Sequence, residues 1–283
     1  MTADMKRPAA TAWLQSSPAV LLVTAIAIIP SLILLFQAFR TPDGAAFTAE
    51  HFEGLASSRL AAQAFWRTLR VAAWTTVLTI LGGYPLAILI SRARERVAGL
   101  MLAVIIFPLM VSVVVRAFGW VVILGPSGLV NRLLVASGLV AEPLKLMHNE
   151  FGIIVGETQL LLPYMVLSLL AVLQKVDPYL EEAAKSLGAN PIVTFFRVTR
   201  PITLPGLLSG VLLVFSLAMT AFATPQILGG ARSPLLTTLL YRYVFSTYDW
   251  AAAAAVAVLL AAIAIAFVTV QRLLARVWLK ANG

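Results

Sequence analysis

Five long stretches of this 283-residue chain contain no charged side chain, and a sixth apolar stretch contains one. The charge-free runs are residues 8–39, 71–91, 97–115, 201–231 and 250–271, and the sixth, 151–174, is interrupted only by Glu157. A helix of about 20 apolar residues is long enough to cross the hydrocarbon of a bilayer. Because lipid offers the backbone no hydrogen bonds, such segments must be helical. The pattern predicts an all-α, polytopic membrane protein with six transmembrane helices.

We expect these helices to form one transmembrane domain covering residues 1–283. Their predicted bounds are about 18–39, 70–91, 97–120, 151–174, 206–226 and 250–272. Only 12% of the residues are charged, about half the share of a soluble domain. The net charge of +9 does not indicate a nucleic-acid partner, because the cations are scattered between apolar runs. With no cysteine, the chain has neither a disulfide framework nor a thiolate metal site.

The basic residues predict on which side of the membrane each loop lies. Six spans place both termini on one side, and cytoplasmic loops carry the excess of Lys and Arg. If the termini are cytoplasmic, that side holds the larger share of the 21 Lys and Arg, including three arginines in the loop SRARERV at 91–97. We therefore expect both termini and the loop 177–201 in the cytoplasm.

The loop 177–201 contains a short charged segment, EEAAKSLG, at residues 181–188. Asp177 and the proline after it favour the start of a helix, and Gly188 suits a left-handed stop. Asn190 and the next proline predict a second short helix that runs to Pro201. An amphipathic helix lying on lipid is the alternative. The small alanine face of the first helix suits a groove in a protein better than a lipid surface.

The same loop resembles the EAA loop of the membrane subunits of type I binding-protein-dependent ABC importers. The pattern is Glu182-Ala183-Ala184, three residues, Gly188, nine residues and then Val198-Thr199-Arg200-Pro201. Val198 and Arg200 depart from the isoleucine and leucine usual in the family, so no packing role is carried over to Arg200. Longer blocks resemble the spermidine/putrescine permease subunits, at residues 82–96, 113–131, 148–191 and 221–230.

This resemblance implies a fold, partners and a set of coupling residues. The fold would be that of a type I ABC importer permease, in the bacterial inner membrane. The partners would be a second homologous permease subunit, two ATPase subunits that dock at the coupling loop, and an extracytoplasmic solute-binding protein. ATP and Mg²⁺ would bind in the ATPase subunits, and this chain would bind no cofactor. The implied ATPase-coupling residues are Glu181, Glu182, Ala183, Ala184, Gly188 and Pro201.

The resemblance further implies a polyamine as the transported solute, with aminoethylphosphonate or iron as alternatives. Glu157 is the only acid deep within a predicted span, so it should face the helix bundle, water or a cation. It is a candidate for the substrate pathway, or a structural acid paired with Arg116 or Arg70. Tyr164 is a second pathway candidate or a packed aromatic. Asp249 and Trp250 form a third, with interfacial anchoring as the alternative.

No catalytic site is evident in the sequence. None of the lysines stands in a G-x-x-x-x-G-K-[ST] loop, which cradles nucleotide phosphates. His51 and His148 are isolated and lack the spacing of metal ligands. The chain is therefore expected to be a transport subunit rather than an enzyme. A rival reading is an ion-coupled secondary carrier that works without an ATPase and uses Glu157 as its coupling acid.

Overall fold

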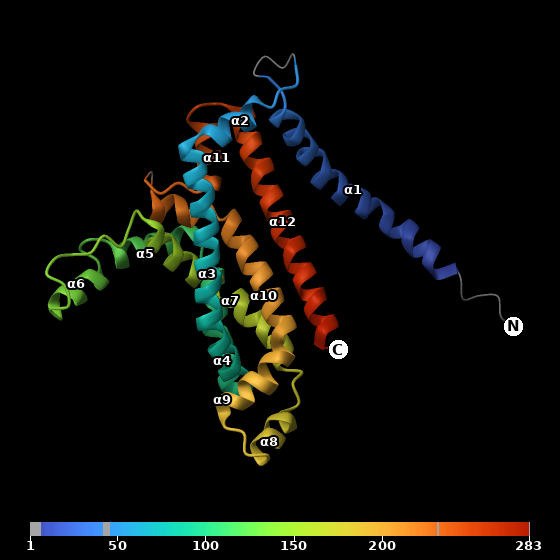
Figure 1. Cartoon of the computed structure of the whole chain (residues 1–283), viewed down its shortest axis with the longest axis vertical. Coiled ribbons are helices and arrows are strands. Elements are labelled where there is room, and N and C mark those ends of the chain that lie inside the picture. The colour runs from blue at the N-terminus through green and yellow to red at the C-terminus, as the bar shows by residue number, and fades with distance from the viewer. Residues whose placement is uncertain (1–6, 42–45, 231, 283) are drawn as a thin grey trace. The chain divides into compact units, whose positions relative to one another are not determined.

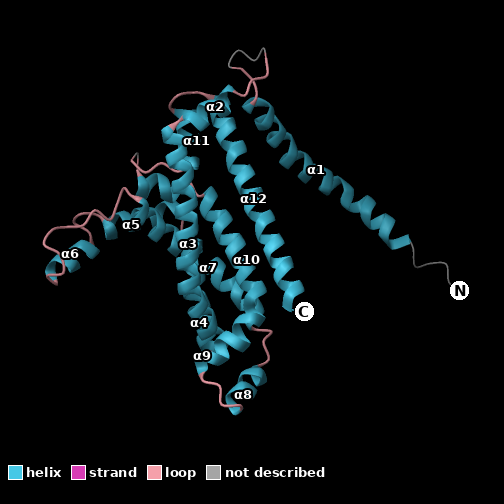
Figure 2. Cartoon of the chain, viewed as in Figure 1, coloured by secondary structure: helices cyan, strands magenta, loops and turns pink. Residues whose placement is uncertain are grey.

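The architecture is all-α, as predicted. A computed structural model describes residues 7–41, 46–230 and 232–282. These residues form helices joined by turns and loops, with one isolated bridge between Arg40 and Phe47 (Figure 2). The helices are α1 (Arg7–Ala38), α2 (Glu50–Ser57), α3 (Arg59–Arg92), α4 (Glu95–Ile106), α5 (Val113–Leu124), α6 (Leu129–Ala136), α7 (Glu150–Leu173), α8 (Pro178–Ser186), α9 (Pro191–Thr194), α10 (Arg200–Thr220), α11 (Leu236–Phe245) and α12 (Trp250–Asn282).

Within the described ranges, six helical segments are long and apolar enough to cross a membrane, which confirms the predicted number. They are Val20–Ala38, Arg59–Arg92, Val113–Ala136, Glu150–Leu173, Pro191–Thr220 and Trp250–Leu273. The fourth and sixth agree closely with the predicted bounds. The second begins about three helical turns earlier than predicted, because α3 starts in a segment with polar residues, which precedes the apolar run on which the prediction rests.

The prediction of one helix over 97–120 is wrong. In the structure α4 ends at Ile106, a 3₁₀ turn covers Phe107–Met110, and α5 begins at Val113. Pro108 is the physical reason, because its ring lacks the N–H that a continuous helix needs and clashes with the preceding turn. The absence of charge shows that residues 97–115 are largely apolar. It does not show that a proline divides the segment into two helices.

The second helix of the loop also differs from the prediction, because it does not stop at Pro201. The chain stays helical from α9 through a π-turn at Phe195–Thr199 into α10. In that turn the Arg200 N–H donates to the Phe195 carbonyl, five residues back. The wider π spacing accommodates Pro201, which has no N–H to offer the preceding turn. The fifth span accordingly starts before residue 206 and ends at Thr220.

The chain expected to be one domain divides into two compact units in the structure. One unit contains residues up to 57 and residues 240–259, and the other contains 58–239 and those from 260 on. In the first unit most apolar side chains in the membrane-length part of α1 are exposed, with Leu21 68% and Val23 65% accessible. Such a surface suits contact with lipid or with another apolar protein surface.

Three helices of the second unit, α3, α7 and α10, pack along one another (Figure 1). Glycines bring their backbones close. A Cβ added at Gly83 would lie 3.0 Å from Met165 Cγ, and one at Gly210 would lie 2.7 Å from Met165 Sδ. At Gly206 the added Cβ would lie 2.8 Å from the Ser168 carbonyl oxygen. Small residues at helix contacts are typical of membrane bundles, in which close packing replaces the hydrophobic drive.

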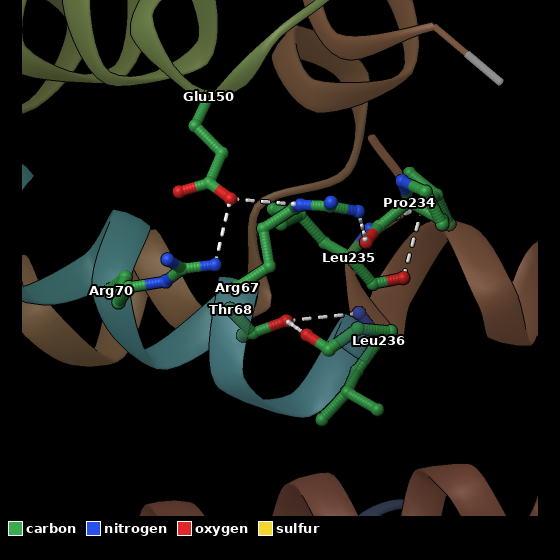
Figure 3. Close-up of polar contacts among 9 residues, drawn as sticks. Arg67, Thr68, Arg70, Glu150, Pro234, Leu235 and Leu236 are labelled. Carbon is green, nitrogen blue, oxygen red and sulfur yellow. Dashed lines mark hydrogen bonds and ion pairs between the residues drawn. The ribbon is translucent and has the colours of Figure 1, made fainter. Parts of the chain in front are cut away.

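A polar cluster joins the N-terminal part of α3 to the start of α7 and of α11 (Figure 3). Glu150 Oε1 accepts hydrogen bonds from Arg67 Nε at 3.0 Å and from Arg70 Nη2 at 2.9 Å. The Thr68 hydroxyl accepts from the Leu236 N–H at 3.0 Å. Arg70 is therefore engaged by Glu150, and the structural pairing of Arg70 with Glu157 considered from the sequence is wrong.

Candidate functional site

The helix that carries the EAA motif is built by the local signals that the sequence predicted. Asp177 Oδ1 caps α8 by accepting from the Tyr179 N–H at 2.9 Å. Gly188 follows the helix with φ +84°, in the left-handed region that glycine adopts without strain. Asn190 Oδ1 caps the next helix by accepting from the Val193 N–H at 2.8 Å. These three predictions are confirmed, and they give α8 a defined start, stop and turn.

The loop 177–201 leaves several large apolar side chains exposed. They are Tyr179, Leu180, Leu187, Ile192 and Phe196, of which Leu187 is 89% accessible. Glu182 and Ala183 of the EAA motif are also exposed, and Ala184 is half-buried. Within the described part of the chain, no hydrogen bond or ion pair involves the Glu182 carboxylate. We refer to these eight residues as the EAA face.

Glu181, next to Glu182 in the chain, has a different environment. Arg92 Nη2, at the end of α3, donates to both of its carboxylate oxygens at 2.7 Å. The Thr199 hydroxyl, in the π-turn, donates to Oε1 at 2.8 Å. Burial raises the pKa of Glu181, but the hydrogen bonds from Thr199 and Arg92 and the positive charges of Arg92 and Lys185 outweigh it and hold that pKa below its usual value.

Glu157 lies on the buried side of α7, with 1% of its surface accessible. It lines a cavity of about 420 Å³ together with Arg116, Tyr164 and Thr224. Thr224 and Arg116 are near enough to act electrostatically on the carboxylate, but neither carboxylate oxygen makes a hydrogen bond of ordinary geometry to any described residue. Arg116 Nε and Nη1 are likewise buried without a hydrogen-bond partner. The structure thus contains no Glu157–Arg116 ion pair.

The four pathway candidates fall in two places. Glu157 and Tyr164 share the cavity just described, whereas Asp249 and Trp250 belong to the other compact unit. Asp249 Oδ1 accepts from the Ala252 N–H at 2.9 Å and so caps α12. Trp250 is 57% accessible, and both line a cavity of about 800 Å³ in their own unit with Arg40. The capping bond gives Asp249 a structural task, whatever else it does.

Sequence reasoning missed two residues of the coupling region, Arg92 and Thr199. In the sequence, Arg92 indicates only the side of the membrane on which its loop lies, and Thr199 stands at a position of the motif that has no assigned role. Both contact Glu181, which is 89 positions from Arg92 and 18 positions from Thr199. No pattern along the chain signals a pairing over that separation. The contact exists because the π-turn and the end of α3 both lie beside α8.

The family model described as "binding-protein-dependent transport system inner membrane component" matches residues 80–279. The spermidine/putrescine transport system permease protein PotB of Haemophilus influenzae is 34% identical over 236 residues, 82% of each chain. The protein of the same description from Escherichia coli K12 is 30% identical, over 82% of this chain and 86% of its own. A molybdenum transport system permease protein of Mycobacterium bovis is 31% identical over 70% of this chain and 73% of its own.

Solved structures show the same fold at lower sequence identity. A bacterial ABC transporter that imports the acidic polysaccharide alginate matches with a TM-score of 0.72 and 20% identity, over 93% of this chain and 95% of that chain. The alginate transporter in complex with its pentasaccharide-bound periplasmic protein matches equally well, with a TM-score of 0.72 and 19% identity, over 95% and 96% of the two chains.

Proposed function

The chain belongs to the family of binding-protein-dependent transport system inner membrane components, and from this premise we propose that it is one of two membrane subunits of an ATP-driven polyamine importer. It is a multi-pass inner-membrane permease of an ABC importer for a small solute, and it is similar to spermidine/putrescine permeases. Such a subunit forms part of a membrane channel and is not a catalytic enzyme. The EAA face is the observation that carries the rest of the proposal.

The EAA face supports an ATPase contact because it leaves apolar side chains and one carboxylate uncovered. In the proposed complex α8 lies in the cytoplasm, as do both termini, and docks on one of two ATPase subunits. Glu182 contributes the unpaired charge, Ala183 and Ala184 allow close approach, and Gly188 and Pro201 set the path of the chain on either side. ATP and Mg²⁺ bind in the ATPase subunits. A second, homologous permease subunit completes the membrane part.

A solute-binding protein delivers the solute, which agrees with a neighbour structure described in complex with a periplasmic protein. The solute then passes the cavity of Glu157 and Tyr164. A buried carboxylate without a partner favours a ligand that carries a protonated amine, since such a charge is costly when nothing compensates it. Polyamines fit this chemistry and the description of the relatives as spermidine/putrescine permeases. Asp249 and Trp250 are proposed to contact the solute or its binding protein at the start of α12.

The experiment is ATP-dependent uptake in proteoliposomes that contain the chain with its partner permease and ATPase. Wild type is expected to import a labelled polyamine only with ATP and the loaded binding protein present. Glu182→Lys should abolish co-purification of the ATPase, because it reverses the free charge of the EAA face. Glu95→Lys, at an exposed acid on α4, is the matched control and should retain it. Equal ATPase binding by both variants would overturn the docking role of the EAA face.

The same experiment separates the rival function. An ion-coupled secondary carrier would take up solute without ATP when a proton or sodium gradient is applied, and Glu157 would be its coupling acid. Uptake by this chain alone under such a gradient would refute the ATP-driven proposal. Iron or aminoethylphosphonate competing better than a polyamine for ATP-dependent uptake would keep the importer and change its solute.

A further inference from the structure

The two adjacent acids of α8 are placed for different tasks. Glu182 is exposed, whereas the Glu181 side chain is 16% accessible and turned toward Arg92 and Thr199. We propose that Glu181, Arg92 and Thr199 are positioning residues that tie the coupling helix to α3 and α10, so that a push on α8 moves both membrane helices together. The proposal rests on the proposed ATP-driven function and assigns the residues that transmit it.

The tie continues from Thr199 into the membrane helices. The Thr203 hydroxyl donates to the Thr199 carbonyl at 2.9 Å, and the Tyr84 hydroxyl hydrogen-bonds the Thr203 hydroxyl. The Tyr84 ring also meets the Phe195 ring edge-on, with centroids 5.3 Å apart. Since Tyr84 and Arg92 both belong to α3, the contacts form a closed circuit from α8 to α3, across to α10 and back through the π-turn to α8.

Burial makes this circuit stiffer than a surface ion pair. The Arg92 side chain is 57% accessible, and an exposed pair by itself contributes little. The other members are covered, however, with Thr199 at 1%, Thr203 at 0% and Tyr84 at 8% accessibility. Separating buried polar groups leaves them without partners, which costs more than the hydrogen bond itself contributes. The hydrogen bond from the buried Thr199 to Glu181 therefore resists separation of α8 from the π-turn, and the buried contacts of Thr203 and Tyr84 hold that turn against α3.

The local backbone supports the same assignment. Arg92 is in the last turn of α3, where a cation interacts favourably with the helix dipole. Thr199 ends the π-turn, and π-turns inside longer helices are frequent at functional sites. The turn keeps α9 and α10 in one continuous helical path, so the residue that holds Glu181 is part of the fifth span rather than of a separate loop. Motion of α8 thus reaches α10 without a flexible linker.

The first test removes the tie and leaves the EAA face intact. The readout is the ratio of ATPase activity with the loaded binding protein to activity without it, in a complex whose wild type shows such stimulation. Glu181→Gln is expected to lower this ratio by about tenfold, the effect of losing a charged hydrogen bond. Arg92→Gln is expected to lower it by less, because the Arg92 side chain is largely exposed. Glu95→Gln, the exposed acid on α4, should keep the ratio. Thr199→Ser should keep it as well, and Thr199→Val should lose it.

The second test distinguishes transmission from stability. The chain has no cysteine, so Arg92→Cys with Glu181→Cys can be bridged selectively by a reductant-cleavable bifunctional reagent of about the length of the lost side chains. The unbridged double variant should have a low ratio, the bridged one should recover the wild-type ratio, and cleavage should remove it again. A bridge that abolishes uptake would show that α8 must move relative to α3, and would overturn the proposal.

The outcomes separate this inference from the proposed function. A wild type without any ATPase stimulation would contradict the ATP-driven importer itself. A stimulated wild type with unaffected Glu181→Gln and Arg92→Gln ratios would contradict only the tie. A third test exchanges the two charges, with Arg92→Glu and Glu181→Arg in one chain. A higher ATPase ratio in the double variant than in either single variant supports a direct contact, and no such recovery counts against it.

Discussion

Replacing Glu157 by glutamine separates a pathway role from a structural one, because the two roles predict opposite results. The substitution keeps the size of the side chain and removes its charge. Glu157 is 1% accessible, lines a cavity of about 420 Å³ and has no hydrogen-bond partner among the described residues. The variant should therefore fold, assemble and bind the ATPase, and yet transport a cationic solute poorly.

The magnitude follows from the charge that an ammonium group would meet. Two opposite unit charges about 4 Å apart attract by about 4 kcal/mol at an effective dielectric constant near 20. Arg116 lines the same cavity and opposes the incoming cation, and the ammonium loses hydration. A net charged hydrogen bond is worth about 1.5–3 kcal/mol. Since 1.4 kcal/mol is a factor of ten, uptake at limiting solute should fall roughly tenfold to a hundredfold.

The thermal stability of the Glu157→Gln complex should rise or stay the same, although its uptake falls. A buried carboxylate without a partner costs free energy in the folded state, and glutamine removes that cost. Glu150→Gln is the contrasting control, because Glu150 accepts hydrogen bonds from Arg67 and Arg70. It should lower the thermal midpoint of the purified complex, since the half-buried Arg67 loses its ion-pair partner and keeps only its hydrogen bond to the Pro234 carbonyl.

The assays are labelled polyamine uptake per folded complex and thermal unfolding of the same preparations. The reasoning is refuted if Glu157→Gln lowers the thermal midpoint while uptake per folded complex stays at the wild-type value. An equal loss of stability in Arg116→Gln would then point to a structural pair that the cavity geometry does not show. Unchanged uptake in a stable variant would remove Glu157 from the pathway and weaken the case for a cationic solute.

Three further predictions concern packing, topology and pH. Gly206→Ala should destabilise the complex by about 1–3 kcal/mol and lower its thermal midpoint, because the added Cβ would lie 2.8 Å from the Ser168 carbonyl oxygen. Gly99→Ala is the control and should be neutral, because no atom lies within 4 Å of its added Cβ. Ser186→Cys should react with an impermeant maleimide only in opened cells and Ser127→Cys in intact spheroplasts, since both positions are exposed; labelling of residue 186 from outside would reverse the assigned orientation. The pKa of Glu181 is lowered in the folded protein. Its contribution to stability is therefore complete above the usual carboxylate pKa, and it is lost only as the pH falls through the lowered pKa of the folded state. The ratio of stimulated to basal ATPase activity should stay constant from pH 8 to about 5, and a decline between pH 7 and 6 would contradict this.

Much of the architecture was predictable because it depends on local properties of the chain. Long apolar runs must become helices in lipid, and this gave the six spans. The caps at Asp177 and Asn190 and the left-handed Gly188 were also predictable, since each depends on side chains within three residues. The depth of Glu157 in an apolar stretch was enough to predict that it faces the helix bundle, water or a cation.

Tertiary structure decided which side chains meet, because those contacts join positions far apart in the chain. In the folded protein Arg70 binds Glu150 rather than Glu157. Glu157 and Arg116 line one cavity without pairing, and Glu181 binds Arg92. The tertiary structure also showed that Pro108 divides an apolar run while Pro201 is absorbed by a π-turn. The composition of a segment determines whether it enters lipid. The partner of a buried charge depends instead on how the helices are rotated against one another, and only their mutual packing sets that rotation.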